Sequence, residues 1–264
     1  MTVMTRENPG AALEAGTPAV RVKGLTKVFG RGDGAAAVLD NVSLDVSPGE
    51  FVCVLGASGC GKSTLLSVIA GLESPTSGEV EVAGGRAALM FQEPALFPWL
   101  SAGGNVELAL RLRGVARGAR RAEAERLLSL VRLDGAADRR VHQLSGGMRQ
   151  RVALARALAQ SSPVLLMDEP FAALDAITRD VLHDELTRLW AETGLSIVFV
   201  THNVREAVRL GQRVVLFSSR PGRIARQWRV DIPQPRRIES PAVAELSVEI
   251  TEHLRQEIRR HGRH

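Results

Sequence analysis

Short apolar runs alternate along the chain with amphipathic stretches, and this alternation predicts an order of strands and helices. Residues 20–54 contain short β-type runs separated by turn signals such as Ser-Pro-Gly-Glu at 47–50. Buried strands are predicted for the apolar runs at 51–55, 87–91, 164–167, 197–200 and 214–217. Amphipathic helices are predicted at about 62–70, 177–190 and 204–210. Strands that alternate with helices in this way predict a mostly parallel sheet.

The pattern changes in the middle of the chain and again near its end. Residues 101–160 are rich in Arg, Ala and Leu without clear strands, which predicts a helical subdomain at about 94–159 inserted into the domain 20–220. We expect a flexible leader at 1–19 and a C-terminal extension at 221–264. Pro241 can open a last helix whose apolar face carries Val243, Leu246, Ile250, Leu254 and Ile258.

Length, composition and charge exclude several classes of protein. The chain has 264 residues, of which 45% are apolar and 24% charged, as in ordinary globular proteins. No apolar run approaches the ~18 residues that span a bilayer. The N-terminus lacks a signal-peptide pattern, so we expect the chain to stay in the cytoplasm. Two cysteines, Cys53 and Cys60, exclude a disulfide scaffold.

The net charge of +5 comes mostly from residues 220–264, which hold ten arginines and six acidic residues. Aromatic residues are not interleaved among these arginines, as they are in many nucleic-acid sites. The charge therefore favours a solvated basic surface, including one near acidic lipid headgroups, over a nucleic-acid partner.

Residues 56–63, Gly-Ala-Ser-Gly-Cys-Gly-Lys-Ser, match the phosphate loop G-x-x-x-x-G-K-[ST] between a predicted strand and a predicted helix. Glycines let the backbone wrap around phosphate, and the helix N-terminus favours the anion. Lys62 is expected to reach the β- and γ-phosphates, and Ser63 to bind Mg²⁺. The strand–loop–helix context argues against a chance glycine-rich turn. The expected nucleotide-binding residues are Gly56, Ser58, Gly59, Cys60, Gly61, Lys62, Ser63 and Thr64.

Two acids follow the strand predicted at 164–167. Asp168 suits a Mg²⁺ site. Glu169 stands one residue further on, where a carboxylate can polarise an attacking water as general base. Taken alone, two acids after a strand are more often a helix N-cap or a surface turn. Their combination with the phosphate loop favours the catalytic interpretation.

Leu-Ser-Gly-Gly-Met at 144–148 precedes a predicted amphipathic helix. It fits an ordinary helix N-cap, but Ser145 and the amides of Gly146 and Gly147 also form a second anion site. The segment resembles the signature of the ATP-binding subunits of ABC transporters. Residues of about 20–220 resemble this family, because further motifs occur in its order. They are Phe29 as the aromatic on adenine, Gln92 as the Q-loop, Asp175 as the D-loop and His202 as the switch histidine.

Three of these residues have simpler explanations when each is considered alone. His202 could be a structural hydrogen-bonding group, Gln92 a polar residue that ends a strand, and Phe29 a core residue. The resemblance implies instead that His202 contacts the γ-phosphate and takes part in catalysis. It also implies that Gln92 coordinates Mg²⁺ and senses the membrane partner.

Residues 93–100, Glu-Pro-Ala-Leu-Phe-Pro-Trp-Leu, resemble a segment of the nitrate, sulfonate and taurine branch of ABC importers. Leu96, Phe97 and Trp99 could be buried core, but we favour an exposed patch that meets a coupling helix of a transmembrane subunit. The chain departs from the family at Asn203, where Asp is usual, and this neutral residue could weaken interface hydrogen bonding. Residues 84–88 look shortened relative to many members.

The resemblance implies an α/β P-loop NTPase fold: a RecA-like, mostly parallel sheet, an N-terminal antiparallel β subdomain and an inserted helical subdomain. It implies a head-to-tail homodimer in which each ATP, with Mg²⁺, lies between one phosphate loop and the partner's signature. ATP would join the two subunits and hydrolysis would release them. This cycle would drive transmembrane permease subunits from the cytoplasmic face of the inner membrane, with an extracytoplasmic solute-binding protein supplying specificity.

Two other functions are compatible with a nucleotide site. ATPases of this type that act on nucleic acid or ribosomes commonly carry two cassettes or a long coiled coil, and this chain has one cassette and no heptads. A non-enzymatic adaptor would not need Glu169 and His202. We therefore expect an ATPase that powers import of nitrate, a sulfonate, taurine or a related small solute. The sequence does not select among these solutes.

Overall fold

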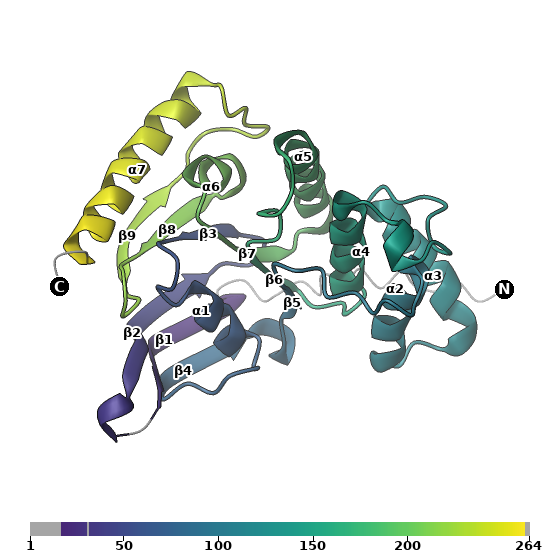
Figure 1. The fold of residues 1–264 in the computed structure, drawn as a ribbon, viewed down its shortest axis with the longest axis horizontal. Coiled ribbons are helices and arrows are strands. Elements are labelled where there is room, and N and C mark those ends of the chain that lie inside the picture. The colour runs from purple at the N-terminus through teal and green to yellow at the C-terminus, as the bar shows by residue number, and fades with distance from the viewer. Residues whose placement is uncertain (1–16, 31, 262–264) are drawn as a thin grey trace.

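The computed structural model describes residues 17–30 and 32–261 (Figure 1). A three-stranded antiparallel sheet has the order β2-β1-β4, with bounds Ala36–Val46, Val20–Phe29 and Ser77–Val82. A six-stranded sheet has the order β5-β6-β7-β3-β8-β9. Its strands are Ala88–Met90, Val164–Asp168, Ser196–Thr201, Phe51–Leu55, Arg213–Phe217 and Ile224–Arg229. The pairs from β5 to β8 are parallel, and β9 is antiparallel to β8.

Seven α-helices surround these sheets in the described part of the chain. They are α1 Lys62–Ile69, α2 Ala102–Leu112, α3 Arg117–Leu130, α4 Gly146–Leu158, α5 Ala176–Thr193, α6 Val204–Leu210 and α7 Pro241–His261. Short 3₁₀ turns occur at Gly32–Gly34, Ala83–Gly85 and Val141–Gln143. No helix among residues 17–30 and 32–261 is long and apolar enough to cross a membrane.

The parallel sheet is covered on both faces, which explains why its strands are continuous apolar runs. Alternate residues of β3 point to opposite faces. Val52 and Val54 belong to a core shared with α1 and the antiparallel sheet. Phe51, Cys53 and Leu55 belong to the other core, which includes residues of α4, α5 and α6. Figure 1 shows α1 between the two sheets, and α5 and α6 on the other side of the parallel sheet.

The helical subdomain consists of α2, α3 and α4, which Figure 1 shows to one side of the sheets. These helices bury apolar residues against one another, including Leu110 of α2, Leu127 of α3 and Val152 of α4. The fold class predicted from the sequence is therefore confirmed: an α/β P-loop fold with an antiparallel β subdomain and a helical insert.

Two strands were not predicted, and one predicted core position is exposed. In β4 no residue is fully buried, and β9 buries only Trp228, so neither has a clear apolar pattern. Within α7, Val243 and Ile250 are fully buried, but Ile258 is 48% exposed because it lies near the free end of the helix. The segment after residue 220 thus supplies an edge strand as well as a helix. Most of the predicted leader, 1–16, lies outside the described residues.

Candidate functional site

The carboxyl ends of neighbouring parallel strands meet at one edge of the large sheet. The strand register pairs Asp168 of β6 with Val200 of β7, and Leu55 of β3 with Thr201 of β7. The phosphate loop therefore begins beside His202 and close to the two acids that end β6. Gln92 follows the next strand, β5. Ligands of open α/β sheets bind at this edge. The structure brings the predicted phosphate loop, the two acids, His202 and Gln92 to it.

Lys62 is the first residue of α1, and its side chain is almost completely buried inside the phosphate loop. Its ammonium group donates hydrogen bonds of 2.9 Å to the carbonyl oxygens of Gly56 and Ala57. No carboxylate within the described residues forms a salt bridge with Lys62. The 2.9 Å partners of the ammonium group are neutral carbonyl oxygens, and a phosphate group would be a stronger partner.

Gly61, just before α1, requires glycine for two reasons. Its φ angle is +102°, in the region that residues with a side chain rarely adopt. A Cβ atom at this position would also lie 2.8 Å from a methyl of Leu39 and 2.9 Å from the carbonyl oxygen of Val38. The loop can therefore fit tightly against β2 only with glycine here.

Ser63 and Asp168 meet beside the phosphate loop. The Asp168 carboxylate lies near the Ser63 hydroxyl and the Lys62 ammonium group. Burial raises the pKa of Asp168 above its usual value, and these two groups only partly oppose this shift. Oxygen atoms of a hydroxyl and a carboxylate are the ligands that Mg²⁺ prefers, so this pair fits such an ion.

Glu169 and His202 form a hydrogen-bonded pair across the ends of β6 and β7. Glu169 Oε2 lies 2.8 Å from His202 Nδ1, and the carboxylate is mostly buried while the imidazole is largely exposed. The φ angle of Glu169 is +43°, a conformation that costs a residue with a side chain about 1 kcal/mol or more. Its backbone N–H donates to the Val200 carbonyl at 3.0 Å, which holds this conformation.

Gln92 is exposed, and its backbone is tied to the signature helix α4. The amide nitrogen of Gln150 donates to the Gln92 carbonyl at 3.0 Å. Arg156, also on α4, donates 2.7 Å hydrogen bonds to the carbonyls of Pro94 and Ala95. Sequence reasoning did not single out Gln150 and Arg156. The sequence gives only a partial indication of these two residues: both are polar side chains among the apolar residues of α4.

Ser145 caps α4, and its hydroxyl accepts from the Met148 N–H at 3.2 Å. Gly147 packs closely on α5, where a Cβ atom would lie 2.7 Å from the Thr178 methyl group. Among residues 17–30 and 32–261, no hydrogen bond joins the 145–147 segment to the phosphate loop. Within one chain the structure therefore does not bring the signature together with Lys62.

Two residues from the predicted motifs also cap helices. Asp175 caps α5 by accepting from the Thr178 N–H at 2.9 Å, and this hydrogen bond lowers the pKa of Asp175. Asn203 caps α6, with its side-chain oxygen accepting from the N–H groups of Arg205 and Glu206 at 3.0 and 3.3 Å. Asn203 therefore makes the N-cap hydrogen bonds that Asp would make at this position.

Phe29 ends β1 and is 40% exposed, so it is not a core residue. The ammonium group of Lys27 lies 4.7 Å from the centre of its ring. That lysine also forms a 2.8 Å ion pair with Glu73. An aromatic face that is accessible at the end of β1 is available to stack on a planar base.

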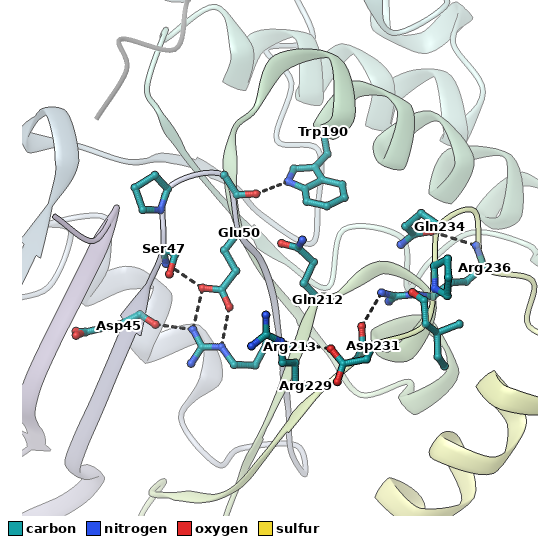
Figure 2. A pocket seen from close by; sticks show the side chains of 15 residues that line it. Asp45, Ser47, Glu50, Trp190, Gln212, Arg213, Arg229, Asp231, Gln234 and Arg236 are labelled. Carbon is teal, nitrogen blue, oxygen red and sulfur yellow. Dashed lines mark hydrogen bonds and ion pairs between the residues drawn. The ribbon is translucent and has the colours of Figure 1, made fainter. Parts of the chain in front are cut away.

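A hollow of about 820 Å³ lies at the opposite edge of the large sheet (Figure 2). Figure 2 shows Trp190, Gln212 and the Glu50–Arg213 ion pair around it. Glu50, Gln212 and Arg213 stand at or before the starts of β3 and β8, a full strand length of about 16 Å from the phosphate loop, and Trp190 reaches the hollow from α5. Its lining has three acidic and three basic side chains, so charge does not favour a phosphate there. This hollow is not the nucleotide site.

Several known proteins are similar to this chain over most of its length. The ABC transporter family model matches residues 39–172. The taurine import ATP-binding protein TauB of Burkholderia pseudomallei is 45% identical over 88% of this chain and 95% of its own length. The nitrate import ATP-binding protein NrtD of Synechocystis is 44% identical over 81% of this chain and 83% of its own.

A solved structure gives the same result. The dimeric ATP-binding cassette MJ0796, in a post-hydrolysis state bound to ADP and Pi, aligns with a TM-score of 0.70 and 35% identity. The alignment covers 81% of this chain and all of that one. The resemblance drawn from the motifs is confirmed, and the chain belongs to the ATP-binding proteins of the ABC transporter family.

Proposed function

We propose that this chain is the ATP-hydrolysing subunit of an ABC importer for nitrate, taurine, a sulfonate or a related small solute. The observation that carries the catalytic part is the grouping of Lys62, Asp168 and the Glu169–His202 pair at one sheet edge. The solute class rests on the relatives, which are named as taurine and nitrate import proteins.

ATP binds with its phosphates in the loop 56–63. Lys62 exchanges its hydrogen bonds to the Gly56 and Ala57 carbonyls for the β- and γ-phosphates. Ser63 and Asp168, with Gln92, would hold Mg²⁺, which supplies positive charge that stabilises the phosphates as negative charge shifts in the transition state. The other loop amides and the N-terminus of α1 contact the remaining phosphate oxygens.

Glu169 acts as the general base for hydrolysis. Its carboxylate accepts a proton from a water as the water oxygen bonds to the γ-phosphorus and the bond to ADP breaks. His202 keeps the Glu169 carboxylate in position through the 2.8 Å hydrogen bond, and its exposed imidazole is free to reach the γ-phosphate. The positive φ of Glu169 directs the side chain toward this edge instead of continuing the strand.

A second copy of the chain completes each site. Ser145, Gly146 and Gly147 do not meet the phosphate loop of their own chain, yet they form an anion site at the start of α4. In a head-to-tail dimer this segment contacts the γ-phosphate bound by the partner, and Asp175 lies at the same interface. The dimeric arrangement of the solved relative MJ0796 supports this assembly.

The exposed aromatic residues of the helical insert dock the permease. Trp99 is 68% exposed and Phe97 is 36% exposed, and their ring centres lie 5.3 Å apart. The side-chain amide of Asn105 accepts from the Phe97 N–H at 2.8 Å and donates to the Phe97 carbonyl at 3.3 Å, which ties the backbone of the patch to α2. A permease bound here places the chain peripherally at the cytoplasmic face of the inner membrane, and a solute-binding protein would meet the permease outside.

Trp99→Ser is expected to weaken permease binding without changing ATP affinity. A central interface tryptophan contributes about 2 kcal/mol or more to binding, so retention of permease should fall roughly 30-fold. The measurement is recovery of permease with the tagged subunit from detergent-solubilised membranes. Leu112→Ser is the matched control, because Leu112 is an even more exposed apolar residue, on α2 and outside the patch. Equal permease recovery with both variants would contradict the docking assignment.

Phe29→Ala is expected to raise the KM for ATP roughly tenfold, because stacking on a base contributes about 1–3 kcal/mol. Phe29→Tyr keeps the ring and should keep the KM close to that of the unmodified chain. Steady-state phosphate release at varied ATP concentration gives both values. An unchanged KM in the alanine variant would remove Phe29 from the adenine site.

The importer assignment is tested by purifying the tagged chain from native membranes in mild detergent and identifying its partners by mass. We expect a permease and a solute-binding protein, and the ligand of the latter would then identify the transported solute. Recovery with ribosomes or nucleic acid, and without a permease, would overturn the transport function while leaving the ATPase site unaffected.

A further inference from the structure

A buried chain of polar groups lies directly behind the Glu169–His202 pair. His183 of α5 contacts Glu206 of α6, with 2.6 Å between His183 Nε2 and Glu206 Oε1. The second oxygen of Glu206 is hydrogen-bonded to the hydroxyl of Thr201, the last residue of β7. All three side chains are almost completely buried. Figure 1 shows α5 and α6 on the same side of β7.

The hydrogen bonds of Thr201 join Glu206 to the His202 loop. The Thr201 hydroxyl accepts from the Asn203 N–H at 3.0 Å, so its single proton is free to go to Glu206. One oxygen of Glu206 therefore accepts from Thr201, and the other shares a hydrogen bond with His183 Nε2. Both oxygens of this buried side chain thus have a polar partner.

The buried polar groups support both loops that carry the catalytic pair. Thr201 and Asn203, which it joins, flank His202 on either side. The ring of Phe171, two residues after Glu169, packs edge-on against the His183 ring with 5.6 Å between ring centres. Asn203 also accepts from the Glu206 N–H, so α6 and the His202 loop are connected twice.

We propose that His183, Glu206 and Thr201 form a positioning network that fixes His202 against Glu169 for hydrolysis. The proposal rests on the role given above to that pair. All three side chains are buried, so each acts through the His202 loop and not by contact with ATP. Loss of the Thr201 hydroxyl leaves the Asn203 N–H and one Glu206 oxygen buried without a partner, and the loop relaxes to satisfy them.

A purely structural role would have a different signature. A network that only stabilises the fold would lower the melting temperature without changing turnover by the molecules that remain folded. A positioning network instead lowers kcat with little change in the KM for ATP, because the phosphate loop makes most of the contacts with ATP.

The test compares Thr201→Val with Thr201→Ser. Valine has the shape of threonine and favours strands, so β7 is retained, but it lacks the hydroxyl. We expect kcat to fall about tenfold or more in the valine variant, with KM within about twofold of the unmodified chain. The serine variant keeps the hydroxyl and should restore most of the turnover. Valine and serine variants with the same kcat as the unmodified chain would overturn the proposal.

A second pair of variants covers the case in which Thr201→Val does not fold. Glu206→Gln can keep both hydrogen bonds if His183 changes tautomer, whereas Glu206→Leu removes both acceptors at similar volume. We expect the leucine variant alone to lose turnover, with unchanged ATP affinity in a fluorescent-nucleotide titration. Equal turnover by the leucine and glutamine variants would contradict the network.

His202→Ala distinguishes failure of this inference from failure of the proposed function. If His202→Ala is inactive while Thr201→Val and Glu206→Leu are fully active, the pair functions without the network and the inference is wrong. If His202→Ala itself hydrolyses ATP normally, the role of the pair is wrong and the network has nothing to position.

Discussion

Glu169→Gln is expected to bind ATP normally and to lose at least about 100-fold in hydrolysis rate, because an amide cannot take the proton from the attacking water. The variant keeps the size of the side chain and its hydrogen-bonding capacity toward His202. Its geometry is therefore little changed, and only the basicity is removed. With ATP bound but not hydrolysed, two copies should stay joined through their two nucleotide sites.

Two measurements together check this expectation. Phosphate release gives the rate, and size-exclusion chromatography with ATP and Mg²⁺ gives the fraction of dimer. Glu79→Gln is the matched control, since Glu79 is an exposed carboxylate on β4, in the three-stranded antiparallel sheet. Normal turnover by Glu169→Gln would remove Glu169 as general base and leave the nucleotide site to be assigned to other groups.

Lys62→Ala is expected to weaken ATP binding by roughly 10- to 150-fold. A buried, charge-assisted hydrogen bond contributes about 1.5–3 kcal/mol, and each 1.4 kcal/mol is a factor of ten in affinity. In the ATP-free chain the same change leaves the Gly56 and Ala57 carbonyls without their donor, so the loop itself should also become less ordered.

The affinity is measured by the rise of the melting temperature with ATP concentration, because a ligand of the folded state stabilises it by RT ln(1 + [ATP]/Kd). Lys23→Ala is the control. Lys23 is exposed on β1, and its substitution removes the same charge at a site away from the phosphate loop. An ATP affinity equal to that of the control would exclude Lys62 from the phosphate site.

The site residues differ in how far a sequence can predict them. The phosphate loop is contiguous, and its glycines, lysine and helix start are specified within eight residues. Helix bounds such as those of α6 follow from local capping and periodicity, and the predicted 204–210 agrees with the structure. Exposed edge strands such as β4 and β9 were missed because they bury too little to leave an apolar pattern.

The exposure of single side chains also needed the structure. Phe29 and Trp99 could each be core or surface residues from the sequence alone. Both are exposed, Phe29 at the end of β1 and Trp99 on the loop before α2. The motif order indicates Phe29 and Trp99 as functional residues, but only packing shows that their rings are accessible.

The sequence by itself determined the family and most of the order of the elements, and it predicts the residues that bind and hydrolyse ATP, because these depend on contiguous motifs. Only the tertiary structure decided that Glu169 is hydrogen-bonded to His202. It also decided that His183, Glu206 and Thr201 are joined by buried hydrogen bonds next to this pair. Those contacts join residues 5 to 33 positions apart in the chain. They arise from strand order and helix packing, which local periodicity does not encode.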